Sequence, residues 1–76
     1  MSAKAFVLIE TSVGRTKEVA NVLRKLEGVQ SVDPVTGPYD VIAVIERESL
    51  SEIGDLVTSQ IHPVTGISRT VTCLAI

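Results

Sequence analysis

The sequence has very few of the residues that small domains use for cross-links or metal sites. It contains one cysteine, Cys73, and one histidine, His62, in 76 residues. A single cysteine excludes an internal disulfide, and one cysteine with one histidine cannot complete a four-ligand zinc site. A domain of this size buries only about 60–65% of its unfolded surface, so its own core gives marginal stability. Association with another chain is the remaining way to gain stability.

Aromatic residues, clustered basic residues and long apolar runs are also scarce. Phe6 and Tyr39 are the only aromatic residues, too few for a platform that stacks on bases. The Lys and Arg residues are scattered among more numerous acidic residues, with a net charge of −2, so no basic stripe could follow a phosphate backbone. No stretch approaches the roughly 18 apolar residues that cross a membrane, and the N-terminal run is too short for a signal peptide. We expect a cytoplasmic protein with no direct nucleic-acid or membrane contact.

Two short segments, Ala5–Ile9 and Val41–Ile45, are apolar without interruption. They are rich in β-branched residues and short, which indicates strands buried on both faces. A chain of this length can build helices over only one side of a sheet. The other side must then be covered by another copy of the chain or by a different partner.

Apolar residues recur at helical spacing in two segments: Val19, Val22, Leu23 and Leu26, and Ile53, Leu56, Val57 and Ile61. The first set predicts a helix over about residues 15–27, which Gly28 ends in a left-handed cap. Ser49 and Glu52 have the spacing of a capping box and predict the start of the second helix. Gly54 inside that helix indicates a close approach to the sheet.

Two further strands are predicted, Val29–Val35, which Pro34 places at a sheet edge, and Ile67–Ile76 after Gly66. The order is therefore β-α-β-β-α-β. Right-handed crossovers convert this order into a ferredoxin-like α+β fold, a four-stranded antiparallel sheet with two helices on one face. Residues 1–76 are expected to form a single domain whose open sheet face is an oligomer interface.

Few residues could catalyse a reaction. Cys73 lies within an apolar strand and His62 at a helix end, so we interpret the first as a small buried residue and the second as a complement to the helix dipole. Glu46 and Glu48 flank Arg47 and are typical of a solvated surface. We do not expect an enzyme.

A carboxylate and two hydroxyls remain as candidate binding groups. Asp40 ends the turn that precedes the Val41–Ile45 strand, where it accepts hydrogen bonds from the backbone N–H groups of the turn, binds an ammonium group, or does both. Thr70 and Thr72 are two residues apart and share a strand face, which is also an ordinary edge pattern. Together the three would suit a zwitterionic small molecule.

The turn Val35–Asp40, the apolar strand after it and the segment Gly66–Thr72 together resemble the effector-binding domain of the leucine-responsive/AsnC family of transcription regulators, the "regulation of amino acid metabolism" domain. The resemblance extends from about Ala3 to Ile76. It implies a homodimer with sheets packed face to face (a dimeric α+β barrel) that assembles into an octamer or decamer. It also implies an amino-acid effector bound between dimers, without metal or cofactor. Members of the family carry a separate DNA-binding half, and DNA binding is not carried over.

The resemblance implies a ligand site at Gly37, Tyr39, Asp40, Thr70, Thr72, Cys73 and Leu74. Cys73 stands where a larger side chain is frequent, and Pro38 where a polar or acidic one is. The leading hypothesis is an amino-acid-sensing oligomerisation module that modulates full-length regulators of the family. A purely structural assembly domain, an ACT-type domain and a small dimeric α+β barrel enzyme are the alternatives, although the inward Val, Leu and Ile residues would fill an enzyme's pocket.

Overall fold

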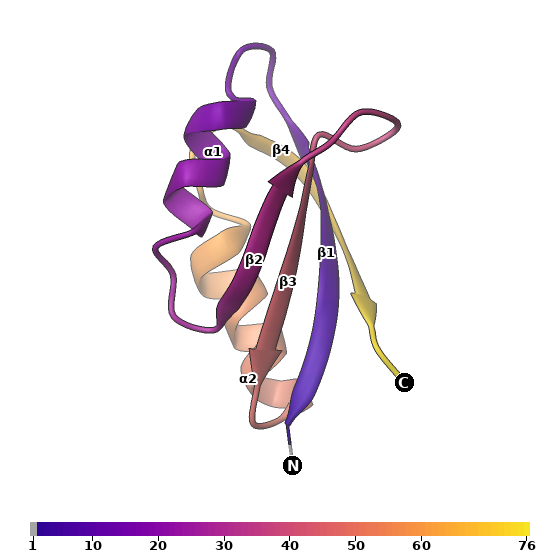
Figure 1. The fold of residues 1–76 in the computed structure, drawn as a ribbon. Helices are drawn as coiled ribbons and strands as arrows, with labels where there is room; N and C mark the ends of the chain where they lie inside the picture. Colours follow the sequence, from indigo (N-terminus) through magenta and orange to yellow (C-terminus); the bar gives the residue numbers. More distant parts are fainter. Residues whose placement is uncertain (1) are drawn as a thin grey trace.

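The computed structural model describes residues 2–76, which form a four-stranded antiparallel sheet with the helices on one side (Figure 1). The elements are, in order, β1 (Ala3–Thr11), α1 (Thr16–Leu23), β2 (Val29–Pro34), β3 (Val41–Arg47), α2 (Leu50–Leu56), the π-helical turn η1 (Val57–Ile61) and β4 (Ile67–Leu74). The strand order is β2-β3-β1-β4, so the two strands predicted to be central are central. The ferredoxin-like fold and the element order are confirmed.

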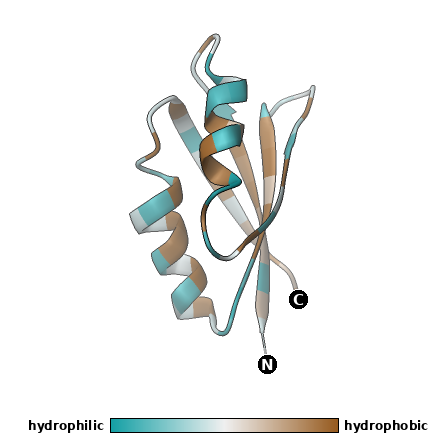
Figure 2. Ribbon diagram, turned by 60° about the vertical axis from the view of Figure 1, so that its left-hand side comes forward, coloured by the Kyte–Doolittle hydropathy of each residue, from teal (hydrophilic) through white to brown (hydrophobic). Residues whose placement is uncertain are grey.

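The core lies between the helices and one face of the sheet. Because side chains alternate along a strand, every second residue of β1 and β3 points toward the helices. The buried apolar residues are Ala5, Val7, Ile9, Val19, Ala20, Leu23, Val32, Val41, Ala43, Ile45, Ile53, Leu56 and Ile61. In Figure 2 hydrophobic colouring runs along the central strands, whereas the helices alternate between hydrophobic and hydrophilic colouring. Each helix therefore contributes one stripe to the core.

The first helix is shorter than predicted. It ends at Leu23 rather than near residue 27. The Lys25 N–H donates to the Val22 carbonyl and the Leu26 N–H to the Leu23 carbonyl, each at 3.1 Å, so the chain tightens into turns of three residues. The tighter turns keep Leu26 packed against the core while the chain reverses into β2. Gly28, predicted as the helix cap, lies instead in the turn before β2.

The second helix begins as predicted, with the Glu52 N–H donating to Ser49 Oγ at 3.2 Å. The role predicted for Gly54 is wrong, because Gly54 is exposed and a Cβ there would have no neighbour within 4 Å. A close approach is found at Gly66 instead. It has φ of +103°, and a Cβ on it would lie 2.9 Å from Val19 Cγ2. Gly66 thus lets the start of β4 pass close to α1.

Candidate functional site

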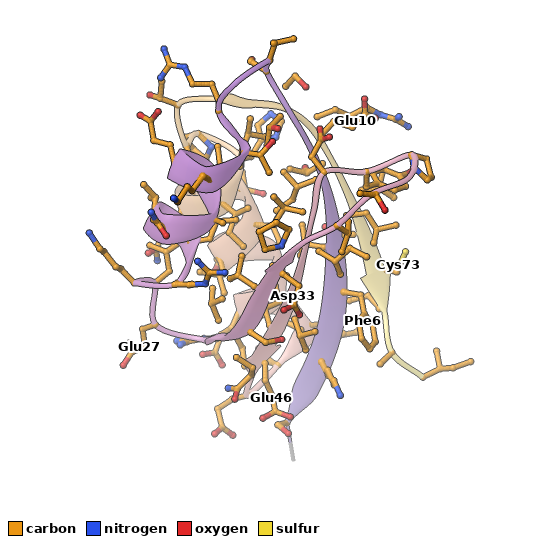
Figure 3. The ribbon with its side chains drawn as sticks, turned by 45° about the horizontal axis from the view of Figure 1, so that its top comes forward. Phe6, Glu10, Glu27, Asp33, Glu46 and Cys73 are labelled. Carbon is orange, nitrogen blue, oxygen red and sulfur yellow. The ribbon has the colours of Figure 1, made fainter. Side chains whose placement is uncertain are left out.

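The side of the sheet away from the helices carries a block of apolar side chains. Cross-strand pairing places Phe6 between Val44 and Cys73, and Leu8 in the next row between Ile42 and Val71. We call these residues the helix-free face: Phe6, Leu8, Ile42, Val44, Val71 and Cys73. Figure 3 shows Phe6 and Cys73 on the neighbouring strands β1 and β4. No element of residues 2–76 covers this face, and Phe6 remains 38% exposed.

The position of Cys73 differs from its prediction. Cys73 is exposed in the single chain, not buried. It pairs with Phe6, and residues opposite each other in antiparallel strands share a face. An apolar strand pattern alone could not tell which of its two faces the helices cover.

Charged groups flank the helix-free face at both ends. Lys4 lies opposite Glu46 at one end, with Lys4 Nζ 5.4 Å from the centre of the Phe6 ring. At the other end Arg69 Nη1 donates to Glu10 Oε2 at 2.7 Å. An apolar centre with a polar rim is the usual arrangement of a protein–protein interface.

Asp40 joins the turn that precedes β3 to the end of β1. Its Oδ2 accepts a hydrogen bond of 2.8 Å from the Thr11 N–H, and its own N–H donates to the Ile9 carbonyl at 2.9 Å. Its carbonyl accepts from the Val35 N–H at 2.9 Å, which closes the turn that contains Gly37 and Tyr39. The carboxylate therefore has a structural role, but its donor comes from β1 rather than from within the turn.

Thr70, Thr72 and Leu74 lie on the helix side of β4, opposite Ile9, Val7 and Ala5 of β1. Thr70 Oγ1 is 3.4 Å from His62 Nδ1. Below Thr72 and Leu74, between the strand and α2, is a groove of about 340 Å³ that we call the α2–β4 groove. It is lined by Leu50, Ile53, Gly54, Val57, Thr58, Thr72 and Leu74.

The predicted ligand residues are not gathered in one place of the single chain. Ile9 of β1 pairs with Val41 on one side and Thr70 on the other, so β1 separates the Asp40 turn from the threonines. Two strand spacings amount to about 10 Å. Cys73 lies on the opposite face of the sheet from Thr72. A pocket that used all these residues would need a second chain.

Sequence reasoning missed the helix side of the α2–β4 groove. Leu50, Ile53, Gly54 and Val57 stand at i, i+3, i+4 and i+7 and form one continuous helical stripe. That spacing is visible in the sequence. The apolar face predicted for this helix already includes Ile53 and Val57, however, and it does not include Leu50 and Gly54.

A second groove, of about 310 Å³, surrounds Arg47 and contains acidic side chains. Arg47 lies 3.9 Å from Glu27 and 3.5 Å from Glu52, in partly exposed ion pairs that contribute roughly 0–1 kcal/mol each. Glu46 and Glu48 are exposed, as the sequence predicted. Over the described part of the chain, no group of His, Cys, Asp or Glu could hold a metal ion, and no helix is long and apolar enough to cross a membrane.

The match to a known protein family extends over nearly the whole chain. A family model described as the Lrp/AsnC ligand binding domain matches residues 4–76. The chain belongs to this family. The resemblance of the turn and the final strand is thereby confirmed.

Relatives of this Lrp/AsnC domain include an uncharacterised HTH-type transcriptional regulator of Pyrococcus furiosus, PF0250. It is 32% identical over 78 aligned residues, which cover 99% of this chain and 52% of the regulator. The chain thus spans about half the length of that regulator. Among solved structures, TTHA0845 from Thermus thermophilus is 36% identical with a TM-score of 0.92, covering 97% of this chain and 92% of that one. The hypothetical protein PHS023 from Pyrococcus horikoshii is 32% identical with a TM-score of 0.91, covering 100% and 90%.

One more distant structure shares the fold alone. The transcriptional regulator NMB0573 from Neisseria meningitidis, solved as a complex with L-Met, has a TM-score of 0.87 at 17% identity. The match covers 97% of this chain and 49% of that regulator.

Proposed function

We propose that this chain is a cytoplasmic domain for amino-acid sensing and oligomerisation, with residues 1–76 as one unit. Two copies pack their helix-free faces together, and these dimers assemble further into an octamer or decamer. A small amino acid binds between dimers. The assembled domain modulates full-length regulators of the Lrp/AsnC family.

The observation that carries the proposal is the uncovered apolar centre of the sheet. Phe6, Leu8, Ile42 and Val44 are large apolar residues of the two central strands, and no helix of the described chain covers them. Fully burying an exposed side chain of this kind is worth about 1.5–3 kcal/mol, and these partly buried residues gain part of that each, which a marginally stable small domain needs. A second copy presents the same surface, so the contact is self-complementary about a two-fold axis.

The proposed effector site combines residues from more than one chain. Asp40 would accept the effector's ammonium group, with Gly37 and Tyr39 shaping the turn around it. Thr70 and Thr72 would donate to its carboxylate and Leu74 would contact its side chain, whereas Cys73, on the other face of the sheet, would contact the effector only from a neighbouring chain. The distant regulator that shares this fold was solved with L-Met, a ligand of the proposed class. The amino acid shifts the equilibrium between two assembled states only through the difference between its affinities for them.

Light scattering coupled to size exclusion, run with each of the twenty amino acids, tests this proposal. We expect a mass above that of one chain and a change in mass or elution with a subset of amino acids. Calorimetry then gives the affinity. If no amino acid binds, the sensing function is wrong although assembly can still occur.

Asp40→Asn separates the ligand role of Asp40 from its structural role. The amide keeps an oxygen that can accept from the Thr11 N–H but removes the charge. A charge-assisted hydrogen bond is worth about 1.5–3 kcal/mol, so amino-acid affinity should fall roughly 10- to 100-fold with assembly unchanged. Asp40→Ala removes both roles and should also destabilise the turn. Equal amino-acid affinity in wild type and Asp40→Asn would contradict the proposed site.

A purely structural assembly domain is the second candidate function. The observation that favours it is the hydrogen bond from the Thr11 N–H to the Asp40 carboxylate, which already gives that side chain a purpose within one chain. Under this alternative the mass is the same with and without every amino acid.

A further inference from the structure

The two edges of the sheet, β2 and β4, differ in whether they can pair with a further strand. At the β2 edge, Val29 pairs with Ile45 and Ser31 with Val44, so Gln30 forms a bulge. Pro34 has no N–H to offer, and Arg24 Nη2 donates to the Val32 carbonyl at 3.0 Å. Bulges, prolines and side chains that occupy edge carbonyls all obstruct pairing with another strand.

The β4 edge has no comparable obstruction over most of its length. Its pairing with β1 shifts only at Ser68, and from Arg69 to Leu74 the register is unbroken. The Ala75 N–H donates to the Lys4 carbonyl at 2.9 Å. Because the hydrogen-bonding direction alternates along a strand, residues 73, 71 and 69 also point their N–H and C=O groups toward β1. Thr70, Thr72 and Leu74 therefore point theirs outward.

The α2–β4 groove lies directly beside this open edge and is equally uncovered. Leu50 is 60% exposed and Leu74 is 49% exposed. No charged side chain of residues 2–76 lines the groove, and the space in front of Gly54 is open. A strand added at the β4 edge would place its helix-side side chains over this groove, whose lining is uncharged and largely apolar.

We infer that β4 pairs with β4 of a second copy, antiparallel and centred on Thr72. This register aligns the whole unbroken segment from Arg69 to Ala75. Thr72 then faces Thr72 and Thr70 faces Leu74, so all the outward main-chain groups are paired. Arg69 faces Ala75, which keeps the two guanidinium groups at opposite ends of the contact. The two α2 helices meet over the grooves, where Gly54 permits close approach.

The occupant is a second copy for reasons of charge and strand properties. A groove lined by uncharged residues gives a charged peptide nothing to pair with. The obstructed β2 edge of another copy fits poorly. Segment 69–75 is β-prone, carries one charge and is self-complementary in this register. The pairing uses the main-chain groups of Thr70, Thr72 and Leu74, whose side chains belong to the proposed effector site, and it leaves the helix-free face available.

Hydrogen exchange of individual amides tests the pairing directly. In the single chain the Thr70, Thr72 and Leu74 amides face solvent, whereas those of Val71 and Cys73 are bonded to β1 and serve as internal controls. We expect the first set to become protected as protein concentration rises, with the second set protected throughout. Fast exchange at Thr72 in protein that is assembled by mass would overturn the inference.

Thr72→Pro tests the pairing by mutation, because it removes only an N–H that points outward and proline is tolerated on that side of an edge strand. Thr72→Val keeps the N–H and is the matched control. Both are made together with Val44→Lys, which disables the helix-free face. We expect Val44→Lys to be a dimer by light scattering, Thr72→Val to leave it so, and Thr72→Pro to convert it to a monomer.

Leu74→Lys gives a second route should Thr72→Pro fail to fold, since Leu74 is half exposed. In the Val44→Lys background it should likewise abolish dimerisation. A dimer that survives either change, or a Val44→Lys protein that is already monomeric at high concentration, overturns the β4 pairing. The proposed function is judged separately, by whether amino acids bind and whether Val44→Lys lowers the mass of the wild-type assembly.

Discussion

The two faces of the sheet carry similar residues in different surroundings. Toward the helices, Val7, Ala43 and Ile45 are fully buried, whereas Phe6 on the other side of the same sheet is 38% exposed. The outer residues nevertheless are as apolar as the inner ones. Strands with one solvated face normally alternate apolar and polar residues. The difference shows that β1 and β3 have the composition of strands buried on both faces. The helices of one chain cover only one of those faces.

A charge at the centre of the helix-free face should have the largest effect on this comparison. Val44→Lys places an ammonium group between two packed sheets, and leaving a charge buried and unpaired costs about 3–5 kcal/mol. We expect the dissociation constant of the face-to-face contact to rise at least about 100-fold, measured by sedimentation or light scattering. Circular dichroism should show a folded chain, because the introduced ammonium group reaches water once the face is open.

Val13→Lys is the matched control for that change. Val13 is fully exposed in the loop between β1 and α1, away from the helix-free face. It should leave the mass unchanged. An unchanged mass for Val44→Lys as well would mean that the two faces differ less than the account requires.

The same substitution, isoleucine to alanine, at two positions of β3 compares the two faces of the sheet directly. Ile45 is fully buried against the helices and Ile42 lies on the helix-free face. Ile45→Ala should lower the free energy of unfolding by about 2–5 kcal/mol at every protein concentration. Ile42→Ala should cost much less in dilute protein and more in concentrated protein, because its cover comes from a second copy.

Urea unfolding at several protein concentrations distinguishes the two isoleucine variants. Equal losses of unfolding free energy for both, independent of concentration, would show that the outer face gains nothing from association.

Most of the fold could be predicted because it depends on local patterns. Apolar runs indicate the central strands, the helical spacing indicates both helices, and Ser49 with Glu52 indicates the start of α2. The errors have physical causes. The end of α1 depends on how Leu26 packs, and the role of Gly54 depends on which way the helix faces. Neither is decided within the segment itself.

The N-terminal cap of α2 lies on the helix side of the sheet, so its removal should not depend on the face-to-face contact. Ser49→Ala removes the acceptor for the Glu52 N–H and should cost about 1 kcal/mol. The loss should be the same in wild type and in Val44→Lys, as measured by thermal unfolding. A loss that differed between these two backgrounds would place the start of α2 in the face-to-face contact and blur the distinction between the faces.

The smallest effect is expected at the rim of the helix-free face. Arg69→Gln breaks the 2.7 Å contact with Glu10, and the two side chains are 62% and 35% exposed. Such a pair is worth about 0.2–1 kcal/mol and weakens with salt. Association should therefore change by less than roughly tenfold at low salt and by less at high salt. A change as large as that of Val44→Lys would move the centre of the contact to the rim.

The candidate site could be predicted only in part. Period-two alternation correctly placed Thr70 and Thr72 on one face, and Asp40 accepts a backbone N–H hydrogen bond, which is the structural role expected of it, although from β1 and not from the turn. The separation of Asp40 from the threonines arises from β1, which lies between their strands. The exposure of Cys73 arises from its pairing with Phe6. Both depend on contacts between distant segments, which no local pattern contains.

The reactivity of Cys73 toward a thiol reagent tests the central claim most directly. The thiol is exposed in one chain and lies on the helix-free face opposite Phe6. If a second copy covers this face, the rate of modification should fall as protein concentration rises, in parallel with the increase in mass, and Val44→Lys should abolish the dependence. A rate that stays constant from dilute to concentrated protein, with the mass of a single folded chain throughout, would contradict the account.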